Sequence, residues 1–243
     1  MSGRTALVVS AHSADFVWRA GGAIALHQEK GMDVTIVCLS FGERGESAKL
    51  WKEAGATLDG VKAARRKEAE NAAQALGAHD IQFFDLGDYP LEMNREARFR
   101  LVDVIRKVQP AFMLSHSLDD PYNTDHPYAA KMTLECRMVA QAWGHDPGEK
   151  VIGAPQLYLF EPHQTEQCGW KPDTILDITP VWEKKKKAIE SMEGQQHLWH
   201  YYTNVAENRA NQFRRNSGGQ AGGREAKYAE AFQSIFPRTV DEL

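Results

Sequence analysis

Short apolar runs rich in β-branched residues alternate along the chain with segments of helical spacing. The runs that predict strands cover residues 5–10, 33–40, 81–86, 111–116, 156–161 and 174–178. The segments that predict helices between them cover residues 21–30, 61–76, 95–108 and 126–142. Strands separated by helices of about 10–15 residues form right-handed crossovers, which make the strands parallel. The alternation therefore predicts an α/β fold with a mostly parallel sheet flanked by helices.

The last third of the chain, after Val181, is polar and has helical spacing, which predicts a helical C-terminal extension. Within it, the charge run EKKKKAIE at residues 183–190 is typical of a solvated helix face. The glycine-rich stretch 216–225 lacks the Lys-Ser/Thr ending of a phosphate loop. No linker divides the chain, and 243 residues suit one α/β domain, so we expect a single domain over 1–243.

Composition excludes several classes of partner. The net charge of −4 gives no sign of a nucleic-acid-binding protein. No apolar run approaches the ~20 residues that a membrane span needs. Three widely spaced cysteines, Cys38, Cys136 and Cys168, argue against a disulfide framework. We therefore expect a cytoplasmic protein with neither a nucleic-acid nor a membrane partner.

Residues able to bind a metal follow several of the predicted strands. Ligands of parallel sheets bind outside the carboxyl ends of the strands, which selects the loops 11–22, 41–48, 115–126 and 161–170. The candidates in these loops are His12, Asp15, His116, Asp119, Asp120, Asp125, His126, Glu161, His163, Glu166 and Cys168. Two imidazoles and one carboxylate form a catalytic zinc site with an open position, although Mn²⁺ or Fe²⁺ accepts the same ligands. The simpler alternative is that Asp15 and Asp125 cap helices.

Several motifs in a fixed order resemble the LmbE/PIG-L family of zinc-dependent N-acetylglucosaminyl deacetylases. They are SAHSADF with a following GG, VTIVCLSFGERGES, ARRKEAENAAQALG, NTDH and YAEAF, and they extend over nearly the whole chain. The resemblance implies a Rossmann-like fold. It also implies a metal bound by the His and Asp of an AHPDD-type motif and by the His that ends an HPDH motif. In this chain those ligands are His12, Asp15 and His126.

Two positions depart from the deacetylase pattern. The acid that precedes the metal-binding aspartate serves in that family as the base that activates water, and here the position is Ala14. The first histidine of HPDH is replaced by Asn123. A methyl group accepts no proton, and loss of a general base typically costs about 10²–10⁴ in rate. The expected metal ligands are therefore present without the expected base.

The sequence AHSADF with the GERGES loop resembles more closely a hydratase branch of this family. That branch adds water to the C=C bond of 4-oxalomesaconate, giving 4-carboxy-4-hydroxy-2-oxoadipate. Such a reaction needs a metal that stabilises an enolate oxygen, one group that activates water and one that protonates carbon. Glu46 and His163 are the candidates for the acid and the base, and the sequence does not assign which is which.

The resemblance also implies a small polycarboxylate substrate and further residues around it. Arg44, Tyr122 and Asn123 are the candidates for substrate binding, and a guanidinium matches a carboxylate in a fork. His116 and Asp120 are expected as hydrogen-bonding partners of the ligand histidines.

Some alternatives stay open at this stage. The aromatic stretch 197–202 and the glycine-rich loop suggest a homo-oligomer. A second hypothesis is an N-deacetylase of an amino sugar or small amide, with Asp120 or His163 as an unusual base. A third is a metal-binding relative without catalytic activity.

Overall fold

The computed structural model describes residues 3–145, 150–217 and 225–237. The strands are β1 (Thr5–Ser10), β2 (Asp33–Cys38), β3 (Asp80–Phe83), β4 (Phe112–Ser115), β5 (Gln156–Phe160), β6 (Thr174–Asp177) and β7 (Ala229–Ser234). The α-helices are α1 (Asp15–Glu29), α2 (Ala48–Trp51), α3 (Leu58–Leu76), α4 (Arg95–Val108), α5 (Asp125–Ala140), α6 (Trp182–Glu190) and α7 (Trp199–Asn216). Three short 3₁₀ helices, η1 (Thr165–Gln167), η2 (Thr179–Val181) and η3 (Glu193–Leu198), join them.

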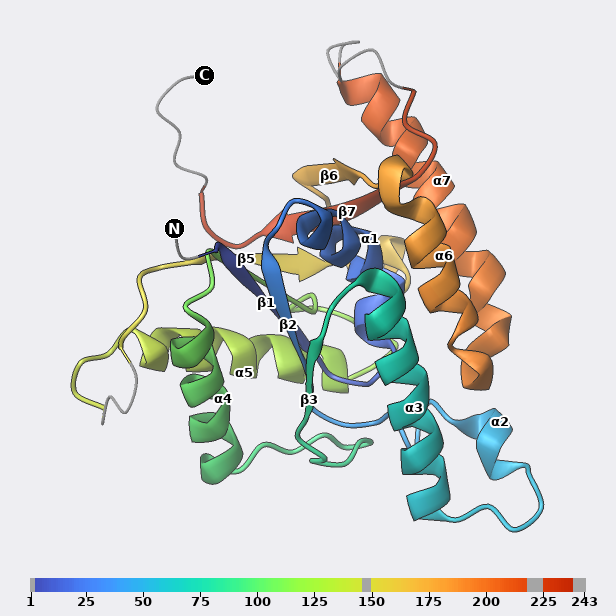
Figure 1. Cartoon of the computed structure of the whole chain (residues 1–243), viewed down its shortest axis with the longest axis horizontal. Coiled ribbons are helices and arrows are strands. Elements are labelled where there is room, and N and C mark those ends of the chain that lie inside the picture. Colours follow the sequence, from blue (N-terminus) through green and yellow to red (C-terminus); the bar gives the residue numbers. More distant parts are fainter. Residues whose placement is uncertain (1–2, 146–149, 218–224, 238–243) are drawn as a thin grey trace.

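The strands form one sheet in the order β3-β2-β1-β4-β5-β7-β6 (Figure 1). Strands β1 to β5 are parallel to one another, and β7 is antiparallel to both β5 and β6. This confirms the predicted α/β class with a mostly parallel sheet. The sequence pattern did not predict β7, because AEAFQS has no β-branched residue and carries a glutamate. The order reverses between β1 and β4, and such a reversal opens a crevice at the carboxyl ends of these two strands.

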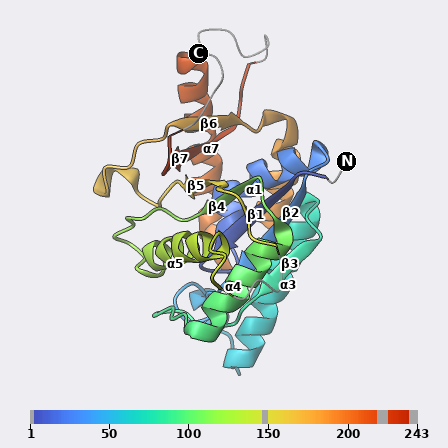
Figure 2. The same cartoon turned by 90° about the vertical axis from the view of Figure 1, so that its left-hand side faces the viewer.

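Helices cover both faces of the sheet, with α4 and α5 on one side and α1, α3, α6 and α7 on the other (Figures 1 and 2). Strand β1 shows how the sequence produces two cores. Ala6 and Val8 belong to the cluster under α1, α3 and α6, whereas Leu7 and Val9 belong to the cluster under α4 and α5. Successive side chains of a strand point to opposite faces. A continuous apolar run therefore supplies both layers and fixes β1 at the centre.

Helix α1 begins at Asp15, six residues before the predicted start at Gly21. The prediction was wrong because two adjacent glycines suggest a loop rather than a helix interior. Here Gly22 permits close packing, since a Cβ atom on it would lie 2.6 Å from Cδ1 of Ile178. The early start places Asp15 in the first turn of α1 instead of at its N-cap, which is Ala14.

The charge run of α6 is not wholly solvated, which corrects the expectation from the sequence. Lys185 is buried, and its Nζ donates to Glu230 of β7 at 2.7 Å and to the carbonyl of Trp18 at 3.1 Å. The Glu230 carboxylate also accepts the backbone N–H groups of Gly22 and Ala23, at 2.7 Å each. The pair thus joins α6, α1 and the C-terminal strand.

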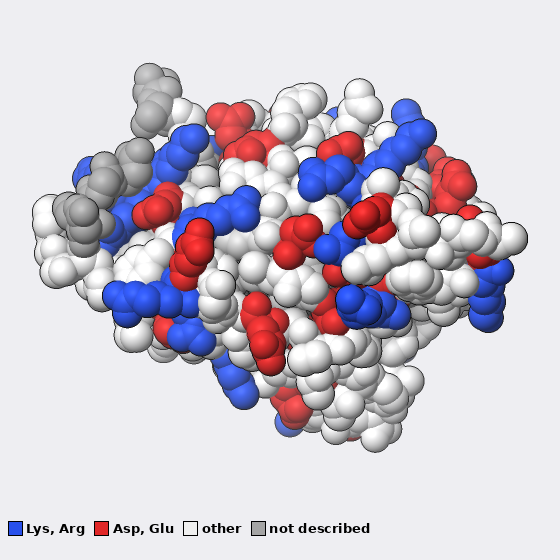
Figure 3. All heavy atoms as spheres, turned by 90° about the horizontal axis from the view of Figure 1, so that it is seen from below, with Lys and Arg blue, Asp and Glu red and all other residues white. Residues whose placement is uncertain are grey.

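The surface agrees with the charge balance of the sequence. Lysines and arginines are interspersed with aspartates and glutamates over the face shown in Figure 3. None of the helices in the described ranges combines the length and the apolarity needed to cross a bilayer. Most of the predicted glycine-rich loop, residues 218–224, lies outside the described residues.

Replacing Glu230 by glutamine should lower the free energy of unfolding by about 3–5 kcal/mol, because Lys185 would remain as an uncompensated buried charge. Urea unfolding followed by circular dichroism measures this change. Lys186→Met, on an exposed position of the same helix, is the control and should have little effect. The double variant Lys185→Met/Glu230→Gln should recover part of the loss. Equal stability of Glu230→Gln and the unmodified protein would contradict the structural role of the pair.

Candidate metal centre

The candidate metal-binding residues meet at the crevice between β1 and β4. His12 lies two residues after the end of β1, His116 directly after β4, and His126 in the first turn of α5. Glu46 comes from the loop that follows β2. The loops that follow β1, β2 and β4, together with the start of α5, thus meet at one edge of the sheet, as the strand pattern predicted.

Four residues form a group that could hold a metal ion: His12, Asp15, Glu46 and His126 each offer one atom within 4.8 Å of the others. Nδ1 of His12 lies 3.1 Å from Oδ2 of Asp15 and 3.2 Å from Oε1 of Glu46. Nε2 of His126 lies 3.4 Å from Oδ1 of Asp15 and 3.9 Å from Oε1 of Glu46. Glu46, expected only as a proton-transfer residue, therefore lies among the ligand atoms themselves.

The hydrogen bonding of His126 fits a metal ligand. Its Nδ1 lies 2.9 Å from Oδ2 of Asp120, which is the contact expected of a carboxylate that orients a ligand histidine. Its Nε2 is buried and has no hydrogen-bond partner among the described residues. A ring that donates Nδ1–H to a carboxylate presents a lone pair at Nε2. That lone pair faces Asp15 and Glu46, where a cation would satisfy it.

Asp125 has a corresponding role for His12, which the sequence did not predict. Its Oδ2 lies 3.2 Å from Nε2 of His12, so the other ring nitrogen faces Asp15 and Glu46. Asp125 also accepts the backbone N–H groups of Tyr89 at 3.0 Å and Leu91 at 2.9 Å. One carboxylate therefore fixes both a ligand ring and the loop before α4. The only sequence feature that points to this role is the position of Asp125 next to His126 in NTDH, and an aspartate at that position equally suits a helix cap.

The carboxylates and imidazoles of the site shift one another's pKa values. Burial alone would lower the pKa of His12, but Glu46, Asp125 and Asp15 raise it well above its usual value. Burial alone would raise the pKa of Asp15, and the charge of His126 instead brings it well below its usual value. A site that attracts protons this strongly also suits a divalent cation.

His116 contacts the group from the side of β4 without being one of its four members. Its Nε2 accepts the backbone N–H of Ala11 at 2.9 Å, so a neutral ring carries its proton on Nδ1. Burial, followed by repulsion from His126, lowers the pKa of His116 to about 3. Its ring stacks on that of His126, with centroids 4.2 Å apart. His116 therefore supports the site as an uncharged packing partner.

The loop that carries Glu46 is held in place by backbone contacts. Asp88 accepts the N–H groups of Arg44 at 2.9 Å and Gly45 at 2.8 Å. Glycine is required at 45, because a Cβ atom there would lie only 2.1 Å from the ring of Tyr89. The Nδ2 group of Asn123 donates to the Glu46 carboxylate at 3.2 Å and to the Tyr89 hydroxyl at 2.9 Å.

The remaining candidates lie farther out. His163 is half-buried, with its ring 4.8 Å from that of Tyr201 and 6.2 Å from that of Tyr122. Burial and the nearby charge of Arg19 lower the pKa of His163. Tyr122 is open to solvent, with 52% of the residue exposed. Arg44 is exposed as well, and only its backbone N–H is engaged by Asp88.

Asp125→Asn should weaken metal binding about 10- to 100-fold, because an amide cannot accept both the His12 ring and the backbone N–H groups now bound by the carboxylate. Competition with a chromophoric chelator measures the affinity. Asp119→Asn, which alters an exposed acid of the same loop, is the control. Unchanged affinity in Asp125→Asn would contradict the role assigned to the His12–Asp125 contact.

Comparison with known proteins agrees with this geometry. Over its full length the chain is similar to a 4-oxalmesaconate hydratase of Pseudomonas putida strain KT2440, with 60% identity over 99% of this chain and 92% of the relative. It is also similar to the crystal structure of the 4-carboxy-2-hydroxymuconate hydratase from Pseudomonas putida KT2440, with a TM-score of 0.95, 60% identity and 99% of both chains covered.

The deacetylases are more distant. A diacetylchitobiose deacetylase of Thermococcus kodakarensis is 29% identical over 78% of this chain and 69% of the relative. Residues 7–137 match the family model PIG-L: GlcNAc-PI de-N-acetylase. These residues include all four members of the candidate metal group. The resemblance drawn from the motifs is therefore confirmed: the chain belongs to the PIG-L family.

Proposed function

We propose that this protein is a metal-dependent hydratase. It adds water to the C=C bond of 4-oxalomesaconate or a similar unsaturated 2-oxo polycarboxylate, giving 4-carboxy-4-hydroxy-2-oxoadipate. The observation that carries the proposal is the 60% identity, over 99% of this chain, to a relative named as such a hydratase. The name 4-carboxy-2-hydroxymuconate, given for the structural relative, denotes the enol form of the same compound.

His12, Asp15 and His126 would hold the metal ion, with Glu46 beside them, and Zn²⁺ is our first choice ahead of Mn²⁺ or Fe²⁺. The donor set of imidazoles and carboxylates and the buried lone pair of His126 support this assignment. When bound, the metal supplies Lewis-acid chemistry, which stabilises negative charge on a substrate oxygen.

The protein's own groups move the protons. Hydration forms a C–O bond at one alkene carbon, the displaced electron pair passes to the conjugated carbonyl oxygen, and a proton is then delivered to the other carbon. We assign proton removal from water to Glu46, because it lies beside the ligand atoms and burial does not prevent its ionisation. Burial alone would raise its pKa, but the charge of His12 contributes to lowering it. His163, on the Tyr201 side of the crevice, is then the donor to carbon.

Three further residues would act on the substrate in this proposal. Asn123 bonds to Glu46 and is placed to orient its carboxylate, in addition to contacting the substrate. Tyr122 and Arg44 are exposed and would contact a bound polycarboxylate from the solvent side. Cytoplasmic location and homo-oligomerisation stay predictions.

Glu46→Gln and His163→Gln should each lower kcat by about 10²–10⁴, because each removes one proton-transfer group. The assay follows loss of the conjugated ultraviolet band of 4-oxalomesaconate with zinc-loaded protein, and metal content is measured for each variant. The controls are Glu53→Gln and His200→Gln, which alter exposed residues of the same types. Unchanged kcat in a metal-loaded Glu46 or His163 variant would contradict the role assigned to that residue.

Ala14→Asp tests the deacetylase alternative, which the family model and the Thermococcus relative bring forward. Ala14 is fully buried and packs in the core under α1, so an aspartate there should lower the midpoint of thermal unfolding. We expect no acetate release from N-acetylglucosamine derivatives and an unchanged or reduced hydration rate. Ala14→Ser controls for polarity without charge. Acetate release by Ala14→Asp, with hydration absent in both proteins, would favour the deacetylase.

A further inference from the structure

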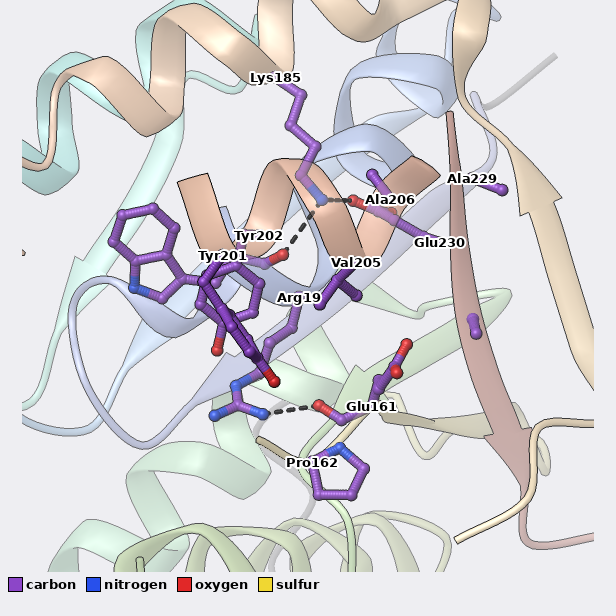
Figure 4. Close-up of a pocket in the computed structure, with 12 residues that line it drawn as sticks. Arg19, Glu161, Pro162, Lys185, Tyr201, Tyr202, Val205, Ala206, Ala229 and Glu230 are labelled. Atoms are coloured by element: carbon purple, nitrogen blue, oxygen red, sulfur yellow. Dashed lines mark hydrogen bonds and ion pairs between the residues drawn. The ribbon is translucent and has the colours of Figure 1, made fainter. Parts of the chain in front are cut away.

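Arg19 is a buried arginine one turn beyond Asp15 on α1, and neither proton transfer nor metal binding uses it. Only 5% of its side chain is exposed. Its Nη1 donates to the backbone carbonyl of Glu161 at 2.6 Å (Figure 4). Its Nε lies 3.7 Å from Oδ1 of Asp15 and, within the described residues, has no hydrogen-bond partner. The guanidinium edge that carries Nε therefore faces the metal group.

No carboxylate within the described residues forms a close pair with this guanidinium. Glu161 offers Arg19 only its backbone oxygen, because its carboxylate is bound by Arg209, whose Nε lies 2.9 Å from Oε2. Asp15 is too distant for a hydrogen bond, and its oxygens already face His12 and His126. Burying an incompletely paired charge costs free energy. The buried charge of Arg19 beside the metal group is explained if its partner is an anionic group of a bound substrate.

The other buried cations near α1 are already committed. Arg65 is paired with Glu68 at 2.6 Å and bonds to Gln195 at 2.8 Å. Lys185 is paired with Glu230, at the far end of the cavity that Arg19 also lines. In Figure 4 the guanidinium of Arg19 lies at the opposite end of this cavity, beside the rings of Tyr201 and Tyr202. Tyr201 in turn contacts His163, so Arg19 lies near both the metal group and the proposed proton donor.

We infer that Arg19 binds a carboxylate of the substrate and determines the selectivity for polycarboxylates. The inference rests on the proposed hydratase function. A guanidinium edge with two N–H groups matches a carboxylate in a fork, and a water-excluded setting strengthens the pair. A substrate carboxylate at Arg19 would lie beside the metal group on one side and His163 on the other. It would thereby place the C=C bond between the two proposed proton-transfer groups. Arg44, the residue favoured by the sequence, would then contribute only at the solvent side.

The test uses the zinc-loaded protein and tricarballylate, a saturated tricarboxylate that cannot be hydrated. Arg19→Met keeps an unbranched apolar stem but removes the guanidinium, and it should raise the Kd for tricarballylate, measured by calorimetry, about 10- to 100-fold. KM for 4-oxalomesaconate should rise more than kcat falls. Arg19→Lys should retain part of the affinity, and methylguanidinium should partly restore binding in Arg19→Ala.

Two controls separate this role from a structural one. Arg215→Met, at an exposed position near the end of α7, should bind tricarballylate as the unmodified protein does. Metal content and near-ultraviolet circular dichroism of Arg19→Met and Arg19→Lys should stay unchanged. Equal Kd values in the unmodified protein and both Arg19 variants, or no binding of tricarballylate by the unmodified protein, would overturn the inference. Failure of the proposed function is distinguishable, because it appears as absence of hydration by the unmodified protein.

Discussion

The other features of this structure depend on the close approach of carboxylate and imidazole groups at a site from which water is almost excluded. His12, His116 and His126 share the carboxyl edge of β1 and β4 with four carboxylates, and water reaches almost none of them. Each group is stable there only because its neighbours offset its loss of hydration. The arrangement favours a bound cation, and it also makes each ring nitrogen and each carboxylate oxygen dependent on one particular partner.

Those partners tie the site to the fold. Asp125 joins the His12 ring to the loop that precedes α4, and Asp88 holds the loop that carries Glu46. The residues of the site are therefore held by loops whose positions the central strands fix. Ala14 lies in this scaffold directly before Asp15, so a single buried side chain separates this site from one with a second acid at that position.

Much of the architecture could be predicted because it depends on local periodicity. The β-branched runs and the helical spacing predicted six strands and the main helices, and short motifs predicted which residues meet at the crevice. The predictions failed where contacts between residues far apart in the sequence decide the local structure. Gly21 and Gly22 are typical of a loop, yet Ile178 packs against Gly22 inside a helix. Lys185 belongs to a charge run, and only the unpredicted strand β7 brings Glu230 to it. Nothing local distinguishes Arg19 from a surface arginine, since its burial depends on residues about 140 and 180 positions later in the chain.

The placement of β7 has a consequence for how the chain is completed during synthesis. This strand comes last of the seven, yet it lies between β5 and β6, and β6 has no other neighbour in the sheet. Until the ribosome releases the segment around residue 230, β5 presents an open edge and β6 has nothing to join. The same strand carries Glu230 back to α1, the helix that begins at Asp15. Helix α1, which starts at the candidate metal centre, is thus held in part by a strand that is made about 200 residues later.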